Sequence, residues 1–557
     1  MKGRGQKAES KNDFRQAAHF CFLLFAFCFL LAACATAPKP AILDLKIINA
    51  RILDGTGAPW YRGSIGVRGD TIVFIGDLAS ATASATATAT IDAHDAIVAP
   101  GFIDLLGQSQ NGVFADPHLE AKVRQGVTTE VTGEGTSPGP SKRYPRLADY
   151  FDAVMKNGTA LNFALFVGAS NPREIVIGDI NRQPTADEMR EMERIIDQAM
   201  RDGAIGISTS LIYLPAMYST TEEIINLAKV ASRYGGVYFS HIRDEGERMD
   251  SALDEFFRIA REASIPSNIW HMKASGPPSW GRMPHIVERV NEARAQGLDI
   301  AGNVYPYAAS STSLSTLIPD WAMEGGYAEM KKRLADPPQR ARIAEGLRAE
   351  LAKRREKGIY VTRTGTQALA QFDKKFVEEI ATGMNLPADE ALMRLFAETD
   401  SSPGVIFFSM NEADVQTALR QPWVSIGADS GNPSPKARGD QTGVHPRAYG
   451  TFPRVMGHYV RDEHLFTLEE AVRKATSQAA ARVNLHDRGI LRPGMKADII
   501  VFDPDKIRDV ATFDDPHRFS EGVSHVIVNG VPVLRDGAIT SALPGKILRG
   551  RGWTGER

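Results

Sequence analysis

The clearest structural signal in the chain is a pair of short apolar runs that each reach a histidine, VYFSHIRD (237–244) and NIWHMKAS (268–275). Six more apolar runs alternate with helical stretches, such as the one over 186–202 that Gly203 follows as a helix terminator. They are APGFIDLLGQ (99–108), TTEVTGEG (128–135), NFALFVGAS (162–170), AIGISTSL (204–211), DIAGNVYPY (299–307) and VSIGADS (424–430). Eight strands separated by helices predict an α/β fold of the (β/α)8 barrel type.

Both ends of the chain show a different sequence pattern. Residues 41–97 and 487–557 contain short predicted strands, in which apolar and polar residues alternate, separated by glycine turns. We expect these two segments to form one small β-sandwich domain beside a barrel over residues 98–486. Asn529-Gly530 is a typical hairpin turn within it. The interval before the last barrel strand is too long for a loop, and its charged helical runs predict a helical insertion at about 320–400.

The composition is that of a globular protein. The 557 residues are 43% hydrophobic and 24% charged, which argues against a disordered chain or one with many membrane spans. Lysine and arginine number 65 against 67 aspartates and glutamates, a net charge of −2. This balance offers no basic excess for nucleic acid, so we expect a small-molecule partner.

The first forty residues predict export. A basic segment precedes the uncharged run FCFLLFAFCFLLAA (20–33), which is too short to span a membrane. Leu31-Ala32-Ala33-Cys34 resembles the lipobox of bacterial lipoproteins, which implies a signal peptide over 1–33, lipidation of Cys34 and a tether over 34–40. The protein would then be anchored by lipid to a bacterial membrane and face the periplasm. Cleavage at an ordinary Ala-x-Ala site is the alternative.

The three cysteines, Cys21, Cys28 and Cys34, all lie in this leader, so the body of the chain can form neither a disulfide nor a cysteine-rich zinc cluster.

Polar residues at four predicted strand ends indicate a metal site. Glu134, His241, His271 and Asp429 follow the second, fifth, sixth and eighth strands. In such barrels the catalytic groups lie at the carboxyl ends of the strands. Two imidazoles with two carboxylates suit Zn²⁺, which binds nitrogen and oxygen ligands and can keep one position open for water. A single histidine would more simply be structural, but four such groups favour a metal.

Several stretches resemble a known family. VAPGFID (98–104) is similar to the opening strand of the amidohydrolase superfamily. Further stretches, over about residues 42–550, resemble the N-acyl-D-amino-acid deacylases (D-aminoacylases). They are FSHIRDEG (239–246), HMKASG (271–276), YPYAASST (305–312), HPRAYGTFPR (445–454), EEAVRKATSQAAARV (469–483) and DRGILRPGMKADIIVFDP (487–504).

This resemblance implies roles for particular residues. His241 and His271 would bind a tightly held zinc ion, and Asp429 would be the general base. The positions that hold the substrate α-carboxylate would be Lys273, Tyr305 and Ser311. Lys273, two residues past His271, would project on the same face as that ligand. Arg243 is a further candidate for anion contact, with a salt bridge to Asp244 or Glu245 as the alternative.

The chain also departs from the family pattern. Leu106-Gly107-Gln108 replaces the usual His-x-His, so we expect one tightly bound zinc ion and no second, weaker site. Glu134 stands near the place of the family's cysteine ligand and could replace it, or could instead be a buried carboxylate bonded to backbone N–H groups. The fourth strand ends in Ile207–Ser210 without a lysine, which disfavours a two-metal site bridged by a carbamylated lysine.

The predicted activity is zinc-dependent hydrolysis of the amide bond of N-acyl-D-amino acids, releasing a carboxylate and a D-amino acid. One alternative is a dipeptidase for peptides with a C-terminal D-residue. The other is a catalytically inactive, membrane-tethered binding protein.

Overall fold

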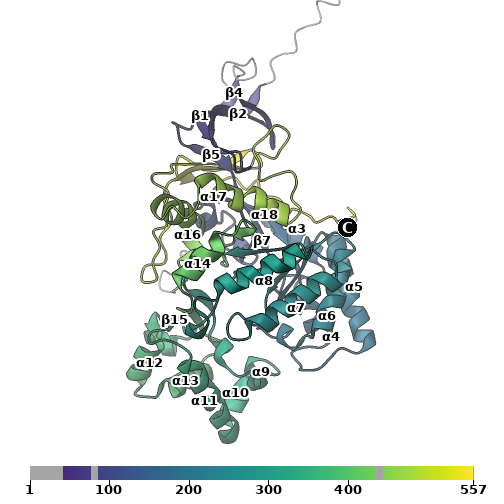
Figure 1. Cartoon of the computed structure of the whole chain (residues 1–557), viewed down its shortest axis with the longest axis vertical. Coiled ribbons are helices and arrows are strands. Elements are labelled where there is room, and N and C mark those ends of the chain that lie inside the picture. Colours follow the sequence, from purple (N-terminus) through teal and green to yellow (C-terminus); the bar gives the residue numbers. More distant parts are fainter. Residues whose placement is uncertain (1–41, 77–85, 434–442, 556–557) are drawn as a thin grey trace, which may run out of the picture.

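A parallel barrel forms the centre of the molecule (Figure 1). The computed structural model describes residues 42–76, 86–433 and 443–555. The barrel strands are β6 (Phe102–Asp104), β7 (Val127–Thr132), β8 (Asn162–Leu165), β9 (Val167–Gly168), β10 (Gly206–Ser210), β11 (Val237–His241), β12 (Ser267–Ile269), β13 (Ile300–Val304) and β18 (Val424–Ile426). Because only Phe166 separates β8 from β9, these two form one strand of the ring. The predicted (β/α)8 barrel is thereby confirmed, with a strand at each of the eight apolar runs.

The ring closes between its first and last strands, β6 and β18. The Leu105 N–H donates to the Ile426 carbonyl at 3.5 Å, and the Gln108 N–H donates to the Ser430 carbonyl at 3.1 Å. Gly107 and Ser430 form a parallel bridge. This closure brings the residues that follow β6 next to those that follow β18.

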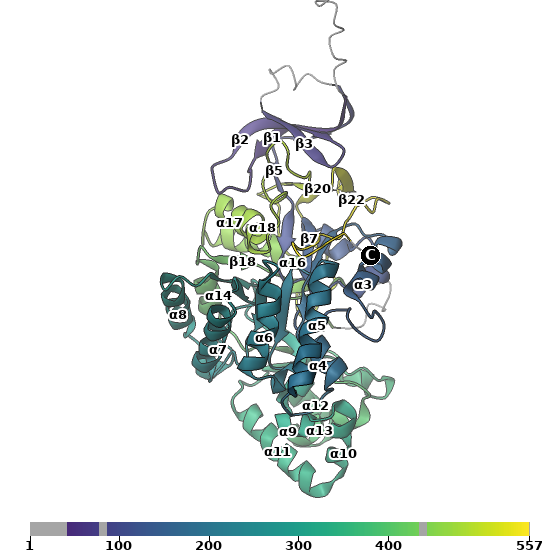
Figure 2. The same ribbon diagram turned by 90° about the vertical axis from the view of Figure 1, so that its right-hand side faces the viewer.

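Helices surround the barrel, as Figure 2 shows. The longest of them, α5 (Ala186–Asp202), begins at a capping box of Thr185 with Glu188 and ends at Gly203, which has a φ of 112°. Glycine adopts this left-handed conformation at low cost, so the helix ends where the sequence predicted. The other helices that cover the barrel are α3 (Leu147–Asn157), α6 (Thr221–Ser232), α7 (Met249–Glu262), α8 (Met283–Ala295), α14 (Glu412–Leu419), α16 (Arg447–Arg454), α17 (Leu468–Ala475) and α18 (Ser477–Arg482).

The two chain ends form one small sheet domain, as predicted, and its nine strands are joined in a single hydrogen-bonded sheet. The strands are β1 (Leu43–Ile52), β2 (Tyr61–Arg68), β3 (Thr71–Gly76), β4 (Ala87–Asp92), β5 (Ile97–Pro100), β19 (Ile499–Phe502), β20 (Val523–Val528), β21 (Val531–Arg535) and β22 (Ala538–Ile539). Strand β5 pairs with β1 on one side and with β19 on the other, which joins the two ends. The first barrel strand therefore begins at Phe102, later than expected, because residues 97–100 belong to this terminal sheet.

The insertion lies at the end of the molecule opposite the terminal sheet (Figures 1 and 2). It contains the predicted helices and also an antiparallel sheet with the order β14-β17-β15-β16, which the sequence analysis missed. The strands are β14 (Ser310–Ser313), β15 (Ile359–Arg363), β16 (Lys375–Phe376) and β17 (Gly404–Phe407), and the helices include α10 (Tyr327–Ala335), α11 (Pro337–Ala352), α12 (Val377–Met384) and α13 (Ala388–Glu398). The strands are short and lie between long charged helices, so their periodicity is weak. The inserted unit has a hydrophobic core of its own.

The last described residues run along the barrel instead of joining the terminal sheet. The Phe163 N–H donates to the Lys546 carbonyl at 2.9 Å, and the Gly550 N–H donates to the Gly203 carbonyl at 2.9 Å. The tail over 543–553 therefore contacts β8 and the segment that leads into β10.

The predictions for residues 1–40, namely the signal peptide, the tether and lipidation at Cys34, lie outside the described residues. Within the described ranges, every helix falls short of the length or the apolar content that a membrane span requires.

Candidate metal and substrate site

Four strand ends bring together the residues that the sequence singled out. Glu134 follows β7, His241 ends β11, His271 follows β12 and Asp429 follows β18. The backbone of His271 and of Asp429 is left-handed, with φ values of 34° and 50°. For residues other than glycine such a conformation costs about 1–3 kcal/mol and is concentrated at functional sites.

The turn that presents Glu134 depends on the glycines on either side of it. Gly133 and Gly135 have φ values of 98° and 64°. A Cβ atom at Gly135 would lie 2.5 Å from the Cβ of Ser210, so no larger residue fits there without a shift. This tight turn positions the Glu134 carboxylate beside His241 and His271.

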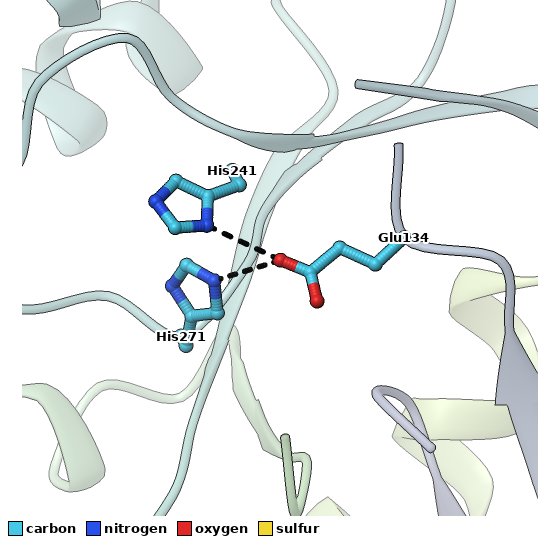
Figure 3. Close-up of side chains that lie close together, drawn as sticks. All are labelled: Glu134, His241 and His271. Atoms are coloured by element: carbon cyan, nitrogen blue, oxygen red, sulfur yellow. Dashed lines mark hydrogen bonds and ion pairs between the residues drawn. The ribbon is translucent and has the colours of Figure 1, made fainter. Parts of the chain in front are cut away.

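Glu134, His241 and His271 converge on one point (Figure 3). Oε1 of Glu134 lies 3.2 Å from Nδ1 of His241 and 3.1 Å from Nε2 of His271. Ligands at the bond lengths of tetrahedral zinc are separated by about 3.3 Å, so the three donor atoms fit a zinc ion. The side-chain partners of Glu134 are these imidazoles and Gln108, instead of the backbone N–H groups of the alternative interpretation.

Glu134 and His271 shift each other's pKa in the direction that favours the charged forms. Burial raises the pKa of Glu134, but hydrogen bonds from His241 and His271 outweigh it and bring that pKa below its ordinary value. Burial and Lys273 lower the pKa of His271, whereas Glu245, Asp429 and Glu134 raise it, to a net value of about 9. A site this rich in negative charge favours a cation between the imidazoles, and a metal ion would displace the protons.

Gln108 bridges Glu134, the carboxylate of the metal site, and Asp429, the predicted general base. Its Nε2 donates to Oε2 of Glu134 at 2.9 Å and to Oδ1 of Asp429 at 3.0 Å. The other oxygen of Asp429, Oδ2, lies 2.9 Å from Nη1 of Arg447. Burial raises the pKa of Asp429, and the positive charge of Arg447 opposes that rise. Asp429 is therefore held in place from both sides.

Two cations flank the ring of Tyr305. Nζ of Lys273 lies 5.8 Å from the ring centroid and Cζ of Arg447 lies 4.5 Å from it. Ser311 reaches this group through its backbone, because its carbonyl accepts a hydrogen bond from Nη2 of Arg447 at 3.2 Å. Lys273 and Tyr305 are thus brought together, and Ser311 is joined to them only through its carbonyl and Arg447. Arg447 is a guanidinium that the sequence analysis did not single out.

His445 holds this arginine in position. It is buried, its Nε2 donates to the Ala309 carbonyl at 2.9 Å, and its Nδ1 accepts from the Arg447 N–H at 3.0 Å. Burial and the charge of Arg447 bring the pKa of His445 well below its ordinary value, so the ring is neutral. The spacing of His445 and Arg447 in HPR was the available sequence signal, but it does not reveal which side chain reaches the site.

Arg243 has other partners. Its guanidinium forms a bidentate salt bridge with Glu255 at 2.8 and 2.9 Å and donates to the carbonyls of Met217 and Ser219. Four of its five N–H groups are therefore occupied by protein atoms. The partner is Glu255 on α7, and neither Asp244 nor Glu245 takes that place. These contacts favour a structural role over the predicted substrate contact.

A cavity of about 770 Å³ opens beside the site, between the barrel loops and the insertion. Its lining includes Leu211, Glu245 and Ser275 from the barrel side and Lys353 and Phe407 from the insertion. This volume is typical of small-molecule sites. The insertion therefore forms one wall of this cavity, which adjoins the metal-facing histidines through Glu245.

A parallel barrel that presents two imidazoles and carboxylates at the carboxyl ends of its strands defines the class of metal-dependent barrel hydrolases. The chain belongs to the amidohydrolase family, which it matches over residues 89–534.

Two relatives and one solved structure are similar to this chain over most of its length. D-aminoacylase of Alcaligenes xylosoxydans xylosoxydans is 36% identical over 91% of this chain and 97% of its own length. N-acyl-D-glutamate deacylase of the same organism is 35% identical over 91% and 96%. The crystal structure of N-acyl-D-glutamate deacylase from Bordetella bronchiseptica, complexed with zinc and a phosphonate inhibitor, superposes with a TM-score of 0.77 at 32% identity and covers 91% of this chain and 100% of that one. The resemblance to D-aminoacylases is confirmed.

Proposed function

We propose that this protein is a zinc-dependent hydrolase that cleaves the amide bond of N-acyl-D-amino acids. The observation that carries the proposal is the donor set of Glu134, His241 and His271, next to the cations Lys273 and Arg447. The relatives named D-aminoacylase and N-acyl-D-glutamate deacylase support this substrate class. When bound, zinc would polarise the scissile carbonyl and lower the pKa of a water molecule.

The residues of the chain supply the remaining steps. Asp429 accepts the proton of the attacking water at a carboxylate oxygen and passes it to the nitrogen of the leaving amine. Gln108 and Arg447 hold that carboxylate, one at each oxygen. Lys273 and Arg447, together with Tyr305, bind the α-carboxylate of the substrate and so fix the amide beside Asp429.

We also propose that the site holds one zinc ion. Nε2 of Gln108 directs its two N–H groups at Glu134 and Asp429, and an amide N–H group is a donor that cannot ligate a cation. The space between these carboxylates is therefore bridged by a hydrogen-bond donor. Zinc content measured by mass spectrometry should be one ion per chain, even in protein prepared with excess zinc.

The activity is tested with a panel of N-acyl-D-amino acids, N-acyl-L-amino acids and dipeptides, assayed with added zinc. We expect hydrolysis of the N-acyl-D-amino acids. Activity on L-substrates alone would contradict the stereochemistry, and preference for dipeptides that end in a D-residue would favour the dipeptidase. Protein that binds no zinc and hydrolyses nothing would favour the binding protein.

We further propose that the protein is exported and anchored by lipid at Cys34, on the periplasmic side of a bacterial membrane. The support is the sequence Leu31-Ala32-Ala33-Cys34 after an apolar run. In a bacterial host, Cys34→Ala should move the protein from the membrane fraction to the soluble fraction. Cys28→Ala, within the apolar run, is the matched control and should stay with the membrane.

A further inference from the structure

Glu245 is an acidic residue at the site to which the proposed function assigns no role. It lies four residues after His241, in the loop that follows β11. Its side chain is 14% exposed and lines the cavity of about 770 Å³ beside the site. Asp244 and Glu247 are acidic neighbours in the same loop, so nothing in the sequence distinguishes Glu245 from them.

The two oxygens of Glu245 face both metal-facing histidines. Oε1 lies 2.9 Å from Nδ1 of His271, and Oε2 lies 3.5 Å from Nε2 of His241. These are the ring nitrogens that point away from Glu134, whose Oε1 contacts Nδ1 of His241 and Nε2 of His271. Nζ of Lys273 also lies 2.6 Å from Oε1 of Glu245.

The chemistry of a metal-bound imidazole requires an acceptor at these outer positions. A ring nitrogen that binds a metal carries no hydrogen, so the other nitrogen of a neutral ring is an N–H donor. Nδ1 of His271 would then donate. Nζ of Lys273 lies 2.6 Å from this nitrogen, but an ammonium has only donors and cannot accept from it. Nε2 of His241 is buried and makes no hydrogen bond among the described residues. Glu245 is the carboxylate that faces both nitrogens.

We propose that Glu245 is a positioning residue that orients both zinc-binding imidazoles through their outer ring nitrogens while it holds the ammonium of Lys273. This role rests on the proposed function, because it requires zinc on the inner nitrogens. One carboxylate thereby ties the metal site to the group that binds the substrate carboxylate. Zinc on the inner nitrogens would place the hydrogen on Nε2 of His241 and on Nδ1 of His271.

The test is the zinc affinity of Glu245→Gln, measured by competition with a chromophoric chelator. The amide of glutamine has a single acceptor oxygen and cannot serve two imidazoles. Loss of such an outer contact typically weakens metal binding about 10- to 100-fold, and we expect a loss in that range. Glu247→Gln is the matched control, because Glu247 lines the same cavity and its ion pair is with Lys353, at 3.4 Å. The control should bind zinc within twofold of the wild type.

Lys273→Met separates the two contacts of Glu245. It should raise the KM for an N-acyl-D-amino acid and leave zinc affinity within twofold of the wild type, because the imidazoles keep their acceptor. A loss of zinc affinity in Lys273→Met equal to that in Glu245→Gln would overturn a direct role of Glu245 on the histidines.

Other results of the zinc measurements would distinguish failure of this inference from failure of the proposed function. Wild-type affinity for zinc in Glu245→Gln would overturn the inference and leave the proposed function standing. Wild-type protein that binds no zinc would overturn both. If Glu245→Gln does not fold, Glu245→Asp, which is one methylene shorter, should bind zinc more weakly, and unchanged affinity in that variant would overturn the inference.

Discussion

In the proposed mechanism, turnover depends most directly on Asp429. Both of its oxygens are engaged, one by Gln108 and one by Arg447. Each carboxylate oxygen has two lone pairs, so Asp429 can keep these contacts and still accept a proton. Its backbone is left-handed, with a φ of 50°, and so departs from the extended conformation of the preceding strand.

We expect Asp429→Asn to lower kcat by about 10²- to 10⁴-fold, the usual contribution of a general base. The amide keeps the size of the side chain but cannot take up the proton. Zinc content should be unchanged, because the zinc-facing donors belong to other residues. Steady-state kinetics with metal analysis checks both points.

Asp254→Asn is the control for this substitution, because Asp254 pairs with Arg289 on the barrel surface and is 69% exposed. It should turn over substrate like the wild type. Undiminished turnover in zinc-loaded Asp429→Asn would refute the assignment of the base.

At the scale of elements, a buried ionic cluster joins the strands beneath the site. Nζ of Lys122, on the short helix α2 (Glu120–Val123), lies 2.9 Å from Oδ2 of Asp104 and 3.2 Å from Oε1 of Glu130, and all three side chains are fully buried. Nζ also donates to the Ser430 carbonyl at 2.7 Å. Oδ1 of Asp104 accepts from the Ala428 N–H at 2.8 Å. The cluster therefore fixes the backbone on both sides of Asp429.

Removing the cation of this cluster should be costly. Lys122→Met leaves two buried carboxylates without their partner, and breaking a buried ion pair in this way typically costs about 3–5 kcal/mol. Urea unfolding followed by circular dichroism should show a loss of this size. Lys156→Met, on the exposed side of α3, is the control and should change the free energy of unfolding by less than about 0.5 kcal/mol.

Glu130 makes the stability of the barrel depend on pH. Burial raises its pKa to about 7, with Lys122 opposing and Asp104 adding to the rise. The native state then binds more protons than the unfolded state between about pH 4.5 and 7, so the free energy of unfolding falls as pH rises through this window. The contribution is fully present below the unfolded pKa and is lost above the folded one.

The matched variant for this effect is Glu130→Gln, which cannot titrate. The free energy of unfolding of the wild type should fall between pH 5 and 8 by about 2–3 kcal/mol more than that of the variant. Parallel pH profiles of the two proteins would contradict the assignment to Glu130.

At the scale of the whole molecule, the C-terminal tail is bonded to the barrel at the end away from the site. The tail over 543–553 contributes four backbone hydrogen bonds, with β8 itself and with the segments that lead into β8 and β10. They join Gly545 to Thr159, Lys546 to Phe163, Leu548 to Phe163 and Gly550 to Gly203. Figure 1 shows the C-terminal end beside α3 and α5, far from the insertion.

Truncation after Ala542 should therefore destabilise the barrel although it leaves the site residues intact. Four backbone hydrogen bonds at about 1 kcal/mol each predict a loss of about 4 kcal/mol in the free energy of unfolding. Truncation after Trp553 keeps these bonds and is the control. Equal urea midpoints for the two truncated proteins would show that the tail contributes nothing to stability.

The sequence by itself determined the barrel, the meeting of the two chain ends and the ring of Glu134, His241, His271 and Asp429. Apolar periodicity identifies strands, and parallel strands in a barrel bring their carboxyl ends to one face, so the residue types at those ends already indicate chemistry.

Only the tertiary structure decided which side chains touch within that ring. These contacts depend on loop conformation and on side-chain rotamers. They are Gln108 between the carboxylates of Glu134 and Asp429, Arg447 on Asp429, Glu245 beside both histidines, and Arg243 on Glu255. The sheet of the insertion was hidden for a similar reason, because its short strands pair with partners up to about a hundred residues away. Periodicity reports how one segment folds, whereas such contacts are set by the packing of segments that are distant along the chain.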